Sequence, residues 1–542
     1  KTITLPETEK GTSLIVRGSE LENVVSNDGV ISQWNIGPRD VTLLLRLSED
    51  GNKENYAEKN VTVTVPDHSD SYPAAWFPTV AQPNDKPEVI PTVQEWYGYE
   101  GNFTLTTDSK IVLNDAAGVG LEKAAANMKA DVEEICGITL EIVTGTAPTG
   151  PNDIYIESLT DPDQYDLGDE GYLMVTNDEG LHIYAPTYTG CLYGTITAEQ
   201  ILWQDETHSA IPKGIMRDYP AYEVRGLMLD VARTPYRYQQ LQDYAKIMLW
   251  YKMSEYHLHI SDNDNSNIIG ATFDTHSGFH RLESDEFPSL KSETKHAGIP
   301  AELVNADYYN NNKDYQGNPT YTKEQWRELE AMCQDMGMYV MTELDMPGHS
   351  LLYNKYAEEN PDGIGWLEGG TMLASTATGN SGYQELLDLI GENKTRAFKF
   401  ASTLWDEYTR GEEPAVYGPV VHIGADEYWV HNKETYNAFA QFADNMRQMI
   451  QKNLGADTKI RMWGAGTGSF STAGEVLEKT PAELAKDYQL DIWYPSYDNA
   501  AKRTAEGYQV INARDAFLYG NPGRRFRDVP NAEYLFYDWN PT

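Results

Sequence analysis

The stretch Val420-Val421-His422-Ile423-Gly424-Ala425-Asp426-Glu427-Tyr428-Trp429 decides the fold that the sequence predicts. It opens with an apolar, largely β-branched run, which is typical of a buried strand in a parallel sheet. Two neighbouring acids, Asp426 and Glu427, follow where that strand is expected to end. Isolated acids are mostly solvated, but acids at a strand end are costly to bury unless they are hydrogen-bonded or functional. Because active sites collect at the C-terminal strand ends of α/β barrels, we expect this pair to belong to a functional site.

The alternation of strand and helix continues through residues 219–542. Strands are expected at Val224–Val231, Tyr256–Ser261, Tyr339–Asp345, Val420–Glu427, Lys459–Gly464, Leu490–Pro495 and Tyr508–Ala513. Helices are expected at Gln240–Lys252, Thr322–Gly337, Arg396–Arg410, Lys433–Leu454 and Ala500–Glu506. Alternating β and α elements indicate a parallel sheet with both faces covered, and this length favours a (β/α)8 barrel of the TIM type. No eighth strand is apparent before Thr542, so the barrel is expected to be cut short before strand 8.

Three regions with a different pattern precede the barrel. Residues 1–75 contain short strand-like runs with period-2 alternation, and they predict a small β-sandwich-like domain. Residues 76–99 hold several prolines between aromatics and read as a linker. Residues 100–218 mix strand patterns with helical spacing, for example over Leu121–Cys136 before Gly137, and they predict an α+β domain.

Composition limits the possible partners. The formal net charge is −41, which argues against nucleic acid and anionic membrane surfaces and suits a neutral ligand. The 36 Tyr and 12 Trp provide many rings suited to sugar faces. No apolar run reaches the ~20 residues of a membrane span. The three cysteines, Cys136, Cys191 and Cys333, are expected to be buried small hydrophobes, with a Cys136–Cys191 bridge as the alternative.

Polar and aromatic side chains follow the predicted barrel strands. They are Asp230, His257, His259, Asp262, Glu343, Asp345, His349, Trp463, Trp493, Tyr519 and Asn521. Side chains at C-terminal strand ends converge on one mouth, where carboxylates supply proton transfer and rings supply walls. A metal cluster of His257, His259, Asp262 and His349 is the alternative, but a metal site needs a ligand geometry that sequence does not give. The prediction is therefore a sugar-cleaving pocket with no metal and no cofactor.

Four motifs in this set resemble those of glycoside hydrolase family 20, the β-N-acetylhexosaminidases and lacto-N-biosidases. In chain order they are Arg225-Gly226 through Asp230, His257-x-His259-x-x-Asp262, Glu343-x-Asp345-x-Pro347-Gly348-His349, and His422-x-Gly424-x-Asp426-Glu427. The α+β domain is also similar to the one that precedes the barrel in that family. The resemblance thus covers roughly residues 100–542, and the segment Val89–Trp96 resembles the bacterial lacto-N-biosidase-like branch.

The resemblance implies a retaining, substrate-assisted reaction, a known exception to the two-carboxylate scheme of glycosidases. Glu427 would be the general acid and then the base. Asp426 would orient the 2-acetamido group, whose carbonyl oxygen attacks the anomeric carbon to give an oxazoline. Tyr519 would donate a hydrogen bond to that carbonyl.

The resemblance also implies binding and supporting roles. Arg225 would bind sugar hydroxyls through its donor fork, and Asp262 would accept from hydroxyls or support the acid. His349 would line the pocket, with Asp345 fixing its tautomer. The remaining candidates are Trp463 and Trp493 as walls of the acetamido pocket, Asn521 as a further binding residue, and His422 as a supporting residue.

These roles predict an exo-acting β-N-acetylhexosaminidase whose partner is a glycan with a terminal β-linked GlcNAc or GalNAc. A lacto-N-biosidase that releases a disaccharide is the alternative within the family, and Arg225 favours the exo enzyme because an arginine on the ring hydroxyls leaves less room for another sugar. A glycan-binding protein without catalysis is the alternative from another class. A secreted or cell-surface bacterial protein is expected in each case.

Overall fold

The computed structural model describes residues 1–50, 52–234, 236–263, 273, 277–292, 320–374, 384–428, 430–464 and 475–520. The predictions for Asn521 and for the end of the barrel before Thr542 lie outside these residues. By internal contacts the chain forms two compact units. The first comprises Lys1–Arg225, Ile247–Met253 and Asp335–Gly337, and the second comprises Gly226–Lys246, Ser254–Gln334 and Met338–Thr542.

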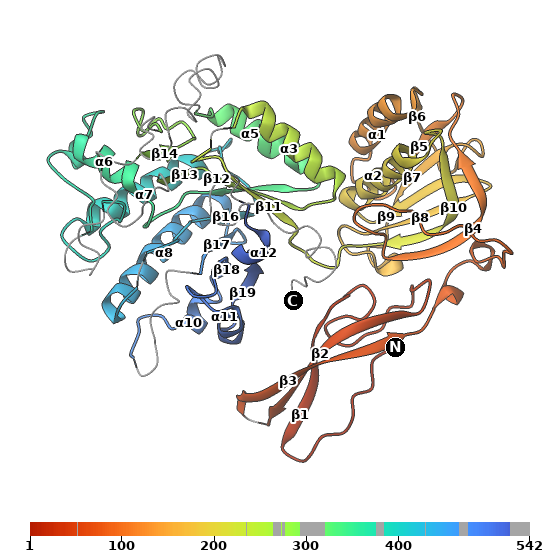
Figure 1. The fold of residues 1–542 in the computed structure, drawn as a ribbon, viewed down its shortest axis with the longest axis horizontal. Coiled ribbons are helices and arrows are strands. Elements are labelled where there is room, and N and C mark those ends of the chain that lie inside the picture. Colours follow the sequence, from red (N-terminus) through yellow and green to blue (C-terminus); the bar gives the residue numbers. More distant parts are fainter. Residues whose placement is uncertain are drawn as a thin grey trace. The chain divides into compact units, whose positions relative to one another are not determined.

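The first unit begins with a three-stranded antiparallel sheet of β1 (Thr12–Ser19), β2 (Arg39–Glu49) and β3 (Asn52–Val65), in that order (Figure 1). Buried side chains of this sheet pack against apolar residues of the β1–β2 loop and Tyr219; the cluster contains Leu21, Val24, Val25, Val41, Leu43, Val65 and Tyr219. The sequence predicted a sandwich of two sheets in residues 1–75, but the described part of this region contains one sheet. The loop between β1 and β2 covers one face of this sheet in place of a second sheet.

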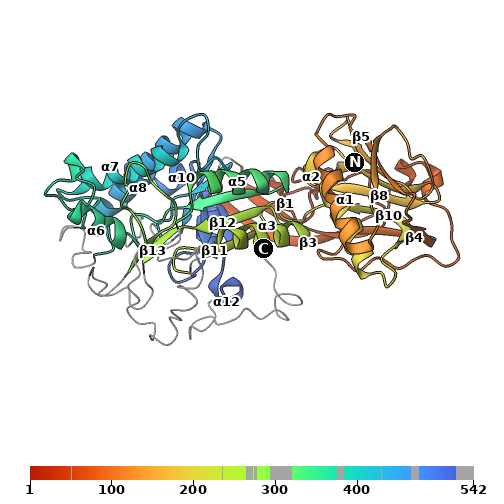
Figure 2. The same ribbon diagram turned by 90° about the horizontal axis from the view of Figure 1, so that it is seen from above.

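A mixed sheet of seven strands forms the rest of the first unit. Its order is β4 (Glu95–Thr104), β10 (Ala210–Asp218), β8 (Tyr172–Asn177), β9 (Gly180–Ala185), β7 (Ile154–Ser158), β5 (Lys110–Asn114) and β6 (Glu141–Thr144). Helices α1 (Glu122–Cys136) and α2 (Tyr188–Gln204) contact each other and the same face of the sheet (Figures 1 and 2). Gly137 ends α1 with a φ of 68°, as its place in the sequence predicted. The predicted linker is shorter than expected, because β4 already begins at Glu95.

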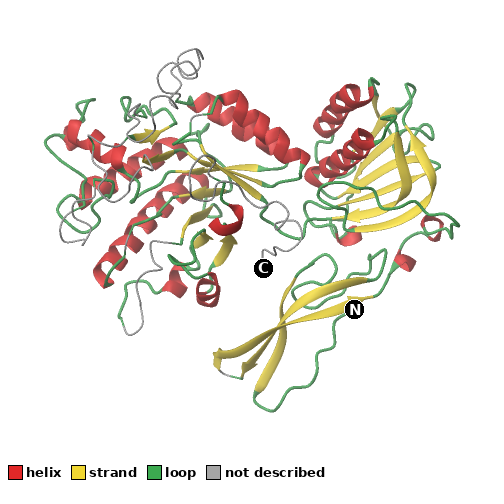
Figure 3. Ribbon diagram, in the orientation of Figure 1, coloured by secondary structure: helices red, strands yellow, loops and turns green. Residues whose placement is uncertain are grey.

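The second unit is built on a parallel sheet whose seven strands follow one another in chain order. They are β11 (Gly226–Asp230), β12 (Glu255–His259), β15 (Tyr339–Glu343), β16 (Val420–His422), β17 (Lys459–Trp463), β18 (Tyr488–Ile492) and β19 (Gln509–Asn512). The helices between them are α3 (Tyr238–Trp250), α5 (Lys323–Asp335), α6 (Leu351–Glu359), α7 (Lys394–Thr409), α8 (Lys433–Leu454), α10 (Pro481–Leu484) and α11 (Ala500–Glu506), and α12 (Asp515–Leu518) follows β19 (Figure 3). A hairpin of β13 (Ser261–Asn263) and β14 (Gly278–His280) follows β12. Parallel strands in sequential order with helices between them are the (β/α)8 arrangement, so the predicted fold class is confirmed.

The stretch that predicted the fold is only partly a strand. β16 ends at His422, and the loop after it has φ angles of 72° at Gly424, 77° at Ala425 and 49° at Glu427. A Cβ on Gly424 would lie 2.3 Å from the Cα of Asp345, so only glycine fits there. A Cβ on Gly348 would in turn lie 2.3 Å from the carbonyl oxygen of Asp426. The two glycines therefore let the loops after β15 and β16 interlock, which places the acids of both loops side by side.

Other predictions concerned membranes and cysteines. Of the helices in the described residues, none is long and apolar enough to cross a membrane. All three cysteines are free, with Cys191 and Cys333 buried and Cys136 half-buried, so the alternative bridge between Cys136 and Cys191 is not formed.

Candidate active site

Asp426 lies at the C-terminal end of the parallel sheet, half-buried, with defined partners for its carboxylate and its backbone. The Trp493 indole N–H donates to Asp426 Oδ1 over 3.1 Å, and the Glu427 backbone N–H donates to the same oxygen over 2.9 Å. The Asp426 backbone N–H donates to Asp345 Oδ1 over 3.3 Å. Asp426 is thus oriented by Asp345, which follows the neighbouring strand β15, and by Trp493, which follows β18, two strands further along the sheet. Asp345 holds this backbone rather than the ring of His349, whose Nε2 lies 4.0 Å from Asp345 Oδ2.

Glu427 is held through both of its carboxylate oxygens. The Tyr497 hydroxyl donates to Oε1 over 3.2 Å, and His349 Nε2 lies 3.4 Å from Oε2. The side chain of Glu427 is 11% exposed to solvent. A carboxylate that is fixed in this way and still reachable from solvent has the geometry that a proton donor needs.

A chain of three charged side chains starts at Glu427 and consists of His349, Asp262 and Arg233. His349 Nδ1 lies 2.8 Å from Asp262 Oδ1, and an Arg233 guanidinium nitrogen lies 2.6 Å from Asp262 Oδ2. Burial disfavours the charged imidazole, but Asp262 and Asp345 outweigh it and hold the pKa of His349 well above its ordinary value. His349 is therefore an imidazolium that faces Glu427.

The two adjacent acids have different proton affinities. Burial, followed by the negative charge of Glu427, raises the pKa of Asp426 to about 7. Burial acts in the same direction on Glu427, but His349 and the Tyr497 hydroxyl outweigh it and lower the pKa of Glu427. The pKa of Asp426 therefore lies above that of Glu427, so Asp426 keeps a proton to higher pH. Neighbouring carboxyls whose pKa values are pushed apart are the usual basis of separate catalytic roles.

Arg225 does not lie with these residues, which corrects the sequence prediction. It precedes β11, at the end of that strand opposite to Asp230. Its guanidinium is bound to Glu170 over 2.5 Å and donates to the carbonyl of Lys252 over 2.9 Å, all within the first unit. The arginine at the site is Arg233, which follows Asp230 and also contacts its carboxylate over 2.9 Å.

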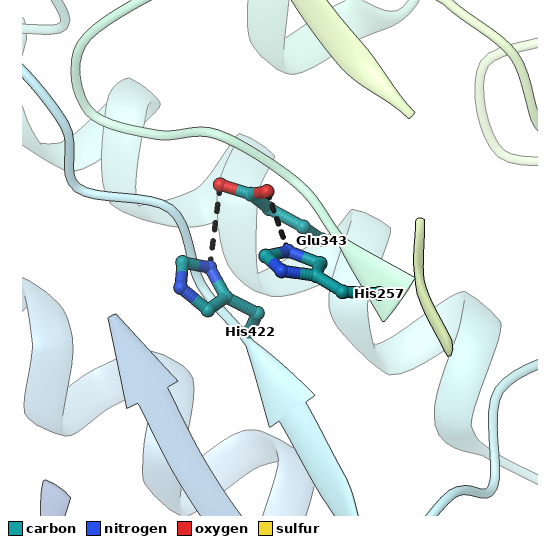
Figure 4. A group of neighbouring side chains, drawn as sticks. All are labelled: His257, Glu343 and His422. Carbon is teal, nitrogen blue, oxygen red and sulfur yellow. Dashed lines mark hydrogen bonds and ion pairs between the residues drawn. The ribbon is translucent and has the colours of Figure 1, made fainter. Parts of the chain in front are cut away.

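Trp463 and His422 belong to a polar network under the acids. Figure 4 shows Glu343 between His257 and His422, with His257 Nε2 at 2.7 Å and His422 Nδ1 at 3.3 Å from its two oxygens. The Trp463 indole N–H donates to Glu343 Oε1 over 2.6 Å, and its ring stacks on His257. Trp463 is only 6% exposed. Its position is that of a floor residue in the barrel, whereas Trp493 contacts Asp426 directly.

The same network contains histidines of the metal cluster that was the alternative prediction from the sequence. His257, Glu343 and His422 lie close enough together to hold an ion. Two of these atoms already have partners of other kinds, since Gly424 N–H donates to His422 Nδ1 over 3.0 Å and the Trp463 indole N–H donates to Glu343. His259 belongs to two further such groups, one with Asp230 and Asp262 and one with Glu343 and Asp345, and its ring forms ion pairs with Asp262 and Glu343. The hydrogen bonds and ion pairs among these side chains need no ion, and we assign no metal to them.

Two tyrosines complete the described part of the site. Tyr519 follows α12, and its ring centre lies 6.5 Å from that of Trp493; burial raises the pKa of its hydroxyl. Tyr497, which the sequence did not predict as a site residue, packs edge-on against Trp493 with ring centres 5.5 Å apart. Tyr519 was predicted from the family resemblance, whereas the only signal for Tyr497 in the sequence was its closeness to Trp493.

Comparisons with known proteins show the family of the chain. The family model described as glycosyl hydrolase family 20, catalytic domain, matches residues 222–540, and the one described as glycosyl hydrolase family 20, domain 2, matches residues 86–219. A β-hexosaminidase of Akkermansia muciniphila is 28% identical over 278 residues, which are 50% of this chain and 48% of that protein. A lacto-N-biosidase of Bifidobacterium bifidum is 24% identical over 488 residues, which are 86% of this chain and 36% of that protein. The chain therefore spans less than half the length of each of these two relatives.

Solved structures show the same fold. A mutant Streptomyces plicatus β-hexosaminidase in complex with its product GlcNAc has a TM-score of 0.58 at 18% identity, covering 85% of this chain and 82% of that chain. The β-N-acetylhexosaminidase of Streptomyces coelicolor has a TM-score of 0.55 at 20% identity, covering 81% and 77%. With the catalytic-domain match across residues 222–540, the barrel and the paired acids after β16, the chain belongs to glycoside hydrolase family 20.

Proposed function

We propose that the chain is a retaining β-N-acetylhexosaminidase that removes terminal β-linked GlcNAc or GalNAc with the help of the substrate's own acetamido group. One observation carries the proposal: the adjacent acids Asp426 and Glu427 have separate sets of partners. Trp493 contacts Asp426, whereas Tyr497 and His349 contact Glu427. One acid is thus placed to orient a group and the other to exchange a proton.

The reaction follows from that division. The acetamide N–H donates to Asp426, which favours the charged form of that carboxylate, so the proton of Asp426 moves to Glu427. The acetamide carbonyl oxygen attacks C1 as the bond from C1 to the leaving oxygen breaks, and Glu427 transfers its proton to that oxygen. The product of this step is a cyclic oxazoline. Water then attacks C1 from the face that the leaving group vacated, Glu427 takes a proton from it, and the configuration is retained.

The pathway needs no nucleophile from the protein. The positive charge that develops on the acetamide nitrogen is stabilised by the ionised Asp426, which the Trp493 N–H and the Glu427 backbone N–H hold in place. The imidazolium of His349, with Asp262 behind it, stabilises Glu427 after it has lost its proton.

Following the hydrolysis of an aryl β-GlcNAc by proton NMR tests the mechanism. The first product should be the β-anomer of GlcNAc, which then mutarotates. If the α-anomer appears first, water has displaced the aglycone directly and the proposal is wrong.

Lacto-N-biosidase activity is the second candidate. The match to the lacto-N-biosidase of Bifidobacterium bifidum covers 86% of this chain, whereas the match to the Akkermansia muciniphila β-hexosaminidase covers 50%. Arg225 gives no reason against a further sugar, because its guanidinium is bound to Glu170 and to the carbonyl of Lys252. Comparing release of the aryl group from aryl GlcNAc and from aryl lacto-N-bioside separates the two: turnover of the disaccharide alone would replace the first proposal by the second.

A further inference from the structure

Asn263, the last residue of β13, connects three segments of the site. Its carbonyl oxygen accepts from Arg233 Nε over 3.0 Å. Its side-chain oxygen accepts from the backbone N–H of Leu351 at the start of α6, two residues after His349, over 3.0 Å. Asn263 is 3% exposed, so these bonds are shielded from water. It therefore ties Arg233 to the segment that carries His349.

Glu385 holds Asn263 from a fourth segment. The Asn263 amide nitrogen donates to Glu385 Oε2 over 2.9 Å, and Glu385 is also 3% exposed. The backbone carbonyl of Glu385 accepts from the Ser350 N–H over 2.7 Å. Glu385 thus makes two contacts: its side chain binds Asn263, and its backbone carbonyl binds Ser350, the residue after His349.

We propose that Glu385 and Asn263 are positioning residues of the site: Glu385 orients the Asn263 amide, and Asn263 keeps Arg233 and the His349 segment at a fixed separation. Neither residue touches the reacting atoms in this assignment. The consequence for catalysis rests on the proposed function, because His349 acts through Glu427 and Arg233 through Asp262.

The charges around Glu385 are consistent with this role. Burial raises the pKa of Glu385 to about 7, His349 and the Asn263 amide oppose that rise, and the negative charges of Glu427 and Asp262 add to it. Asp262 and Asn263 come from β13, His349 from the loop after β15 and Glu427 from the loop after β16. A buried carboxyl in such surroundings is costly unless its hydrogen bonds are made.

Two substitutions at one position separate the hydrogen bond from the charge. Glu385→Ala removes the acceptor for the Asn263 amide, whereas Glu385→Gln keeps an acceptor oxygen and removes the charge. Since a buried bond to a charged group is at stake, we expect Glu385→Ala to lower kcat/KM about tenfold or more and Glu385→Gln to stay within about threefold of the wild type. Glu359→Ala, at the exposed end of α6, is the matched control and should not change kcat/KM.

Hydrogen–deuterium exchange gives a second readout that does not depend on activity. In Glu385→Ala, peptides that contain Ser350 and Leu351 should exchange faster, while peptides from α8 should exchange as in the wild type and in Glu385→Gln. Faster exchange everywhere would indicate general destabilisation and would overturn the proposal, as would equal loss of kcat/KM in both variants, or a wild-type result for Glu385→Ala in either readout. If the wild-type chain hydrolyses no hexosaminide, the proposed function fails and the exchange result decides the positioning role alone.

Discussion

His349 Nε2 lies 3.4 Å from Glu427 Oε2, and the other nitrogen of the same ring lies 2.8 Å from Asp262. The ring therefore connects the half-buried Glu427 to the carboxylate of Asp262, which is 1% exposed. Because the imidazolium favours the ionised form of Glu427, it helps this group to release a proton and to bear the resulting charge. The Tyr497 hydroxyl on the other oxygen of Glu427 acts in the same direction.

If Glu427 protonates the leaving oxygen, Glu427→Gln should lower kcat/KM by ~10²–10⁴ for a substrate with a poor leaving group. The loss should shrink for aryl GlcNAc substrates whose phenols are stronger acids, because such phenolates leave without a proton. A series of aryl substrates, compared by kcat/KM, measures this dependence. Glu434→Gln, at an exposed position in the first turn of α8, is the control. An equal loss of kcat/KM for every leaving group would exclude Glu427 as the general acid. A wild-type rate in Glu427→Gln would show that another residue is the acid.

The proton of Asp426 predicts the alkaline side of the pH profile. Below about pH 7 Asp426 holds a proton, which the reaction needs; above it both acids are ionised, so kcat/KM should fall as the pH rises through about 7. Trp493→Phe removes a hydrogen bond that stabilises the Asp426 carboxylate, so the pKa of Asp426 should rise further and the alkaline limb should move to higher pH. Trp203→Phe, at a residue of α2 that is 60% exposed, should leave the limb in place. A limb that moves to lower pH in Trp493→Phe would contradict this account of the pair.

The sequence predicted the strands of the barrel from short segments with apolar or β-branched residues that recur between helical patterns, and this recurrence survives small errors in the boundaries. It did not predict where the strands stop. β16 ends at His422 although apolar residues continue to Ile423 and Ala425, because the close contact of Gly424 with Asp345 turns the chain there. That contact depends on a segment 79 positions earlier in the chain, as Gly424 and Asp345 are numbered, and local patterns carry no information about it.

The same limit explains why the sequence pointed to Arg225 and not to Arg233 as the arginine of the site. Arg225 and Arg233 lie on either side of β11, and both stand next to residues of the family motif. Only the direction of the strand decides which one reaches the C-terminal end, where Asp262 lies. Tyr497 and Asn263 were missed for a related reason, since Tyr497 lies in a loop, Asn263 ends the short strand β13, and their roles come from contacts with distant segments.

The assignment of Arg233, instead of Arg225, as the arginine of the site can be tested. Arg233→Ala removes a cation that contacts Asp230 and Asp262, so we expect kcat/KM to fall about 10- to 100-fold. Arg225→Ala breaks the contact with Glu170 in the first unit and should cost about 1–3 kcal/mol of folding free energy, with little change in KM. Steady-state kinetics and thermal unfolding of both variants measure the two effects. If Arg225→Ala raised KM while leaving the unfolding temperature unchanged, the original assignment would be restored.

The interlocked loops predict a steric effect at Gly424. Gly424 has a φ of 72° and no room for a Cβ, whereas Gly363 has a φ of 64° and no heavy atom within 4 Å of the position that a Cβ would take. Both Gly→Ala substitutions incur the cost of the left-handed backbone, about 1–2 kcal/mol, so Gly363→Ala is the control for that term. Gly424→Ala must in addition displace Asp345, which should add about 1–3 kcal/mol of destabilisation. Because Asp345 holds the backbone of Asp426, Gly424→Ala should also lower kcat/KM, whereas Gly363→Ala should not. Denaturant unfolding and kinetics of the two variants test this, and equal destabilisation with unchanged kcat/KM would show that the loops after β15 and β16 do not position the acids through this contact.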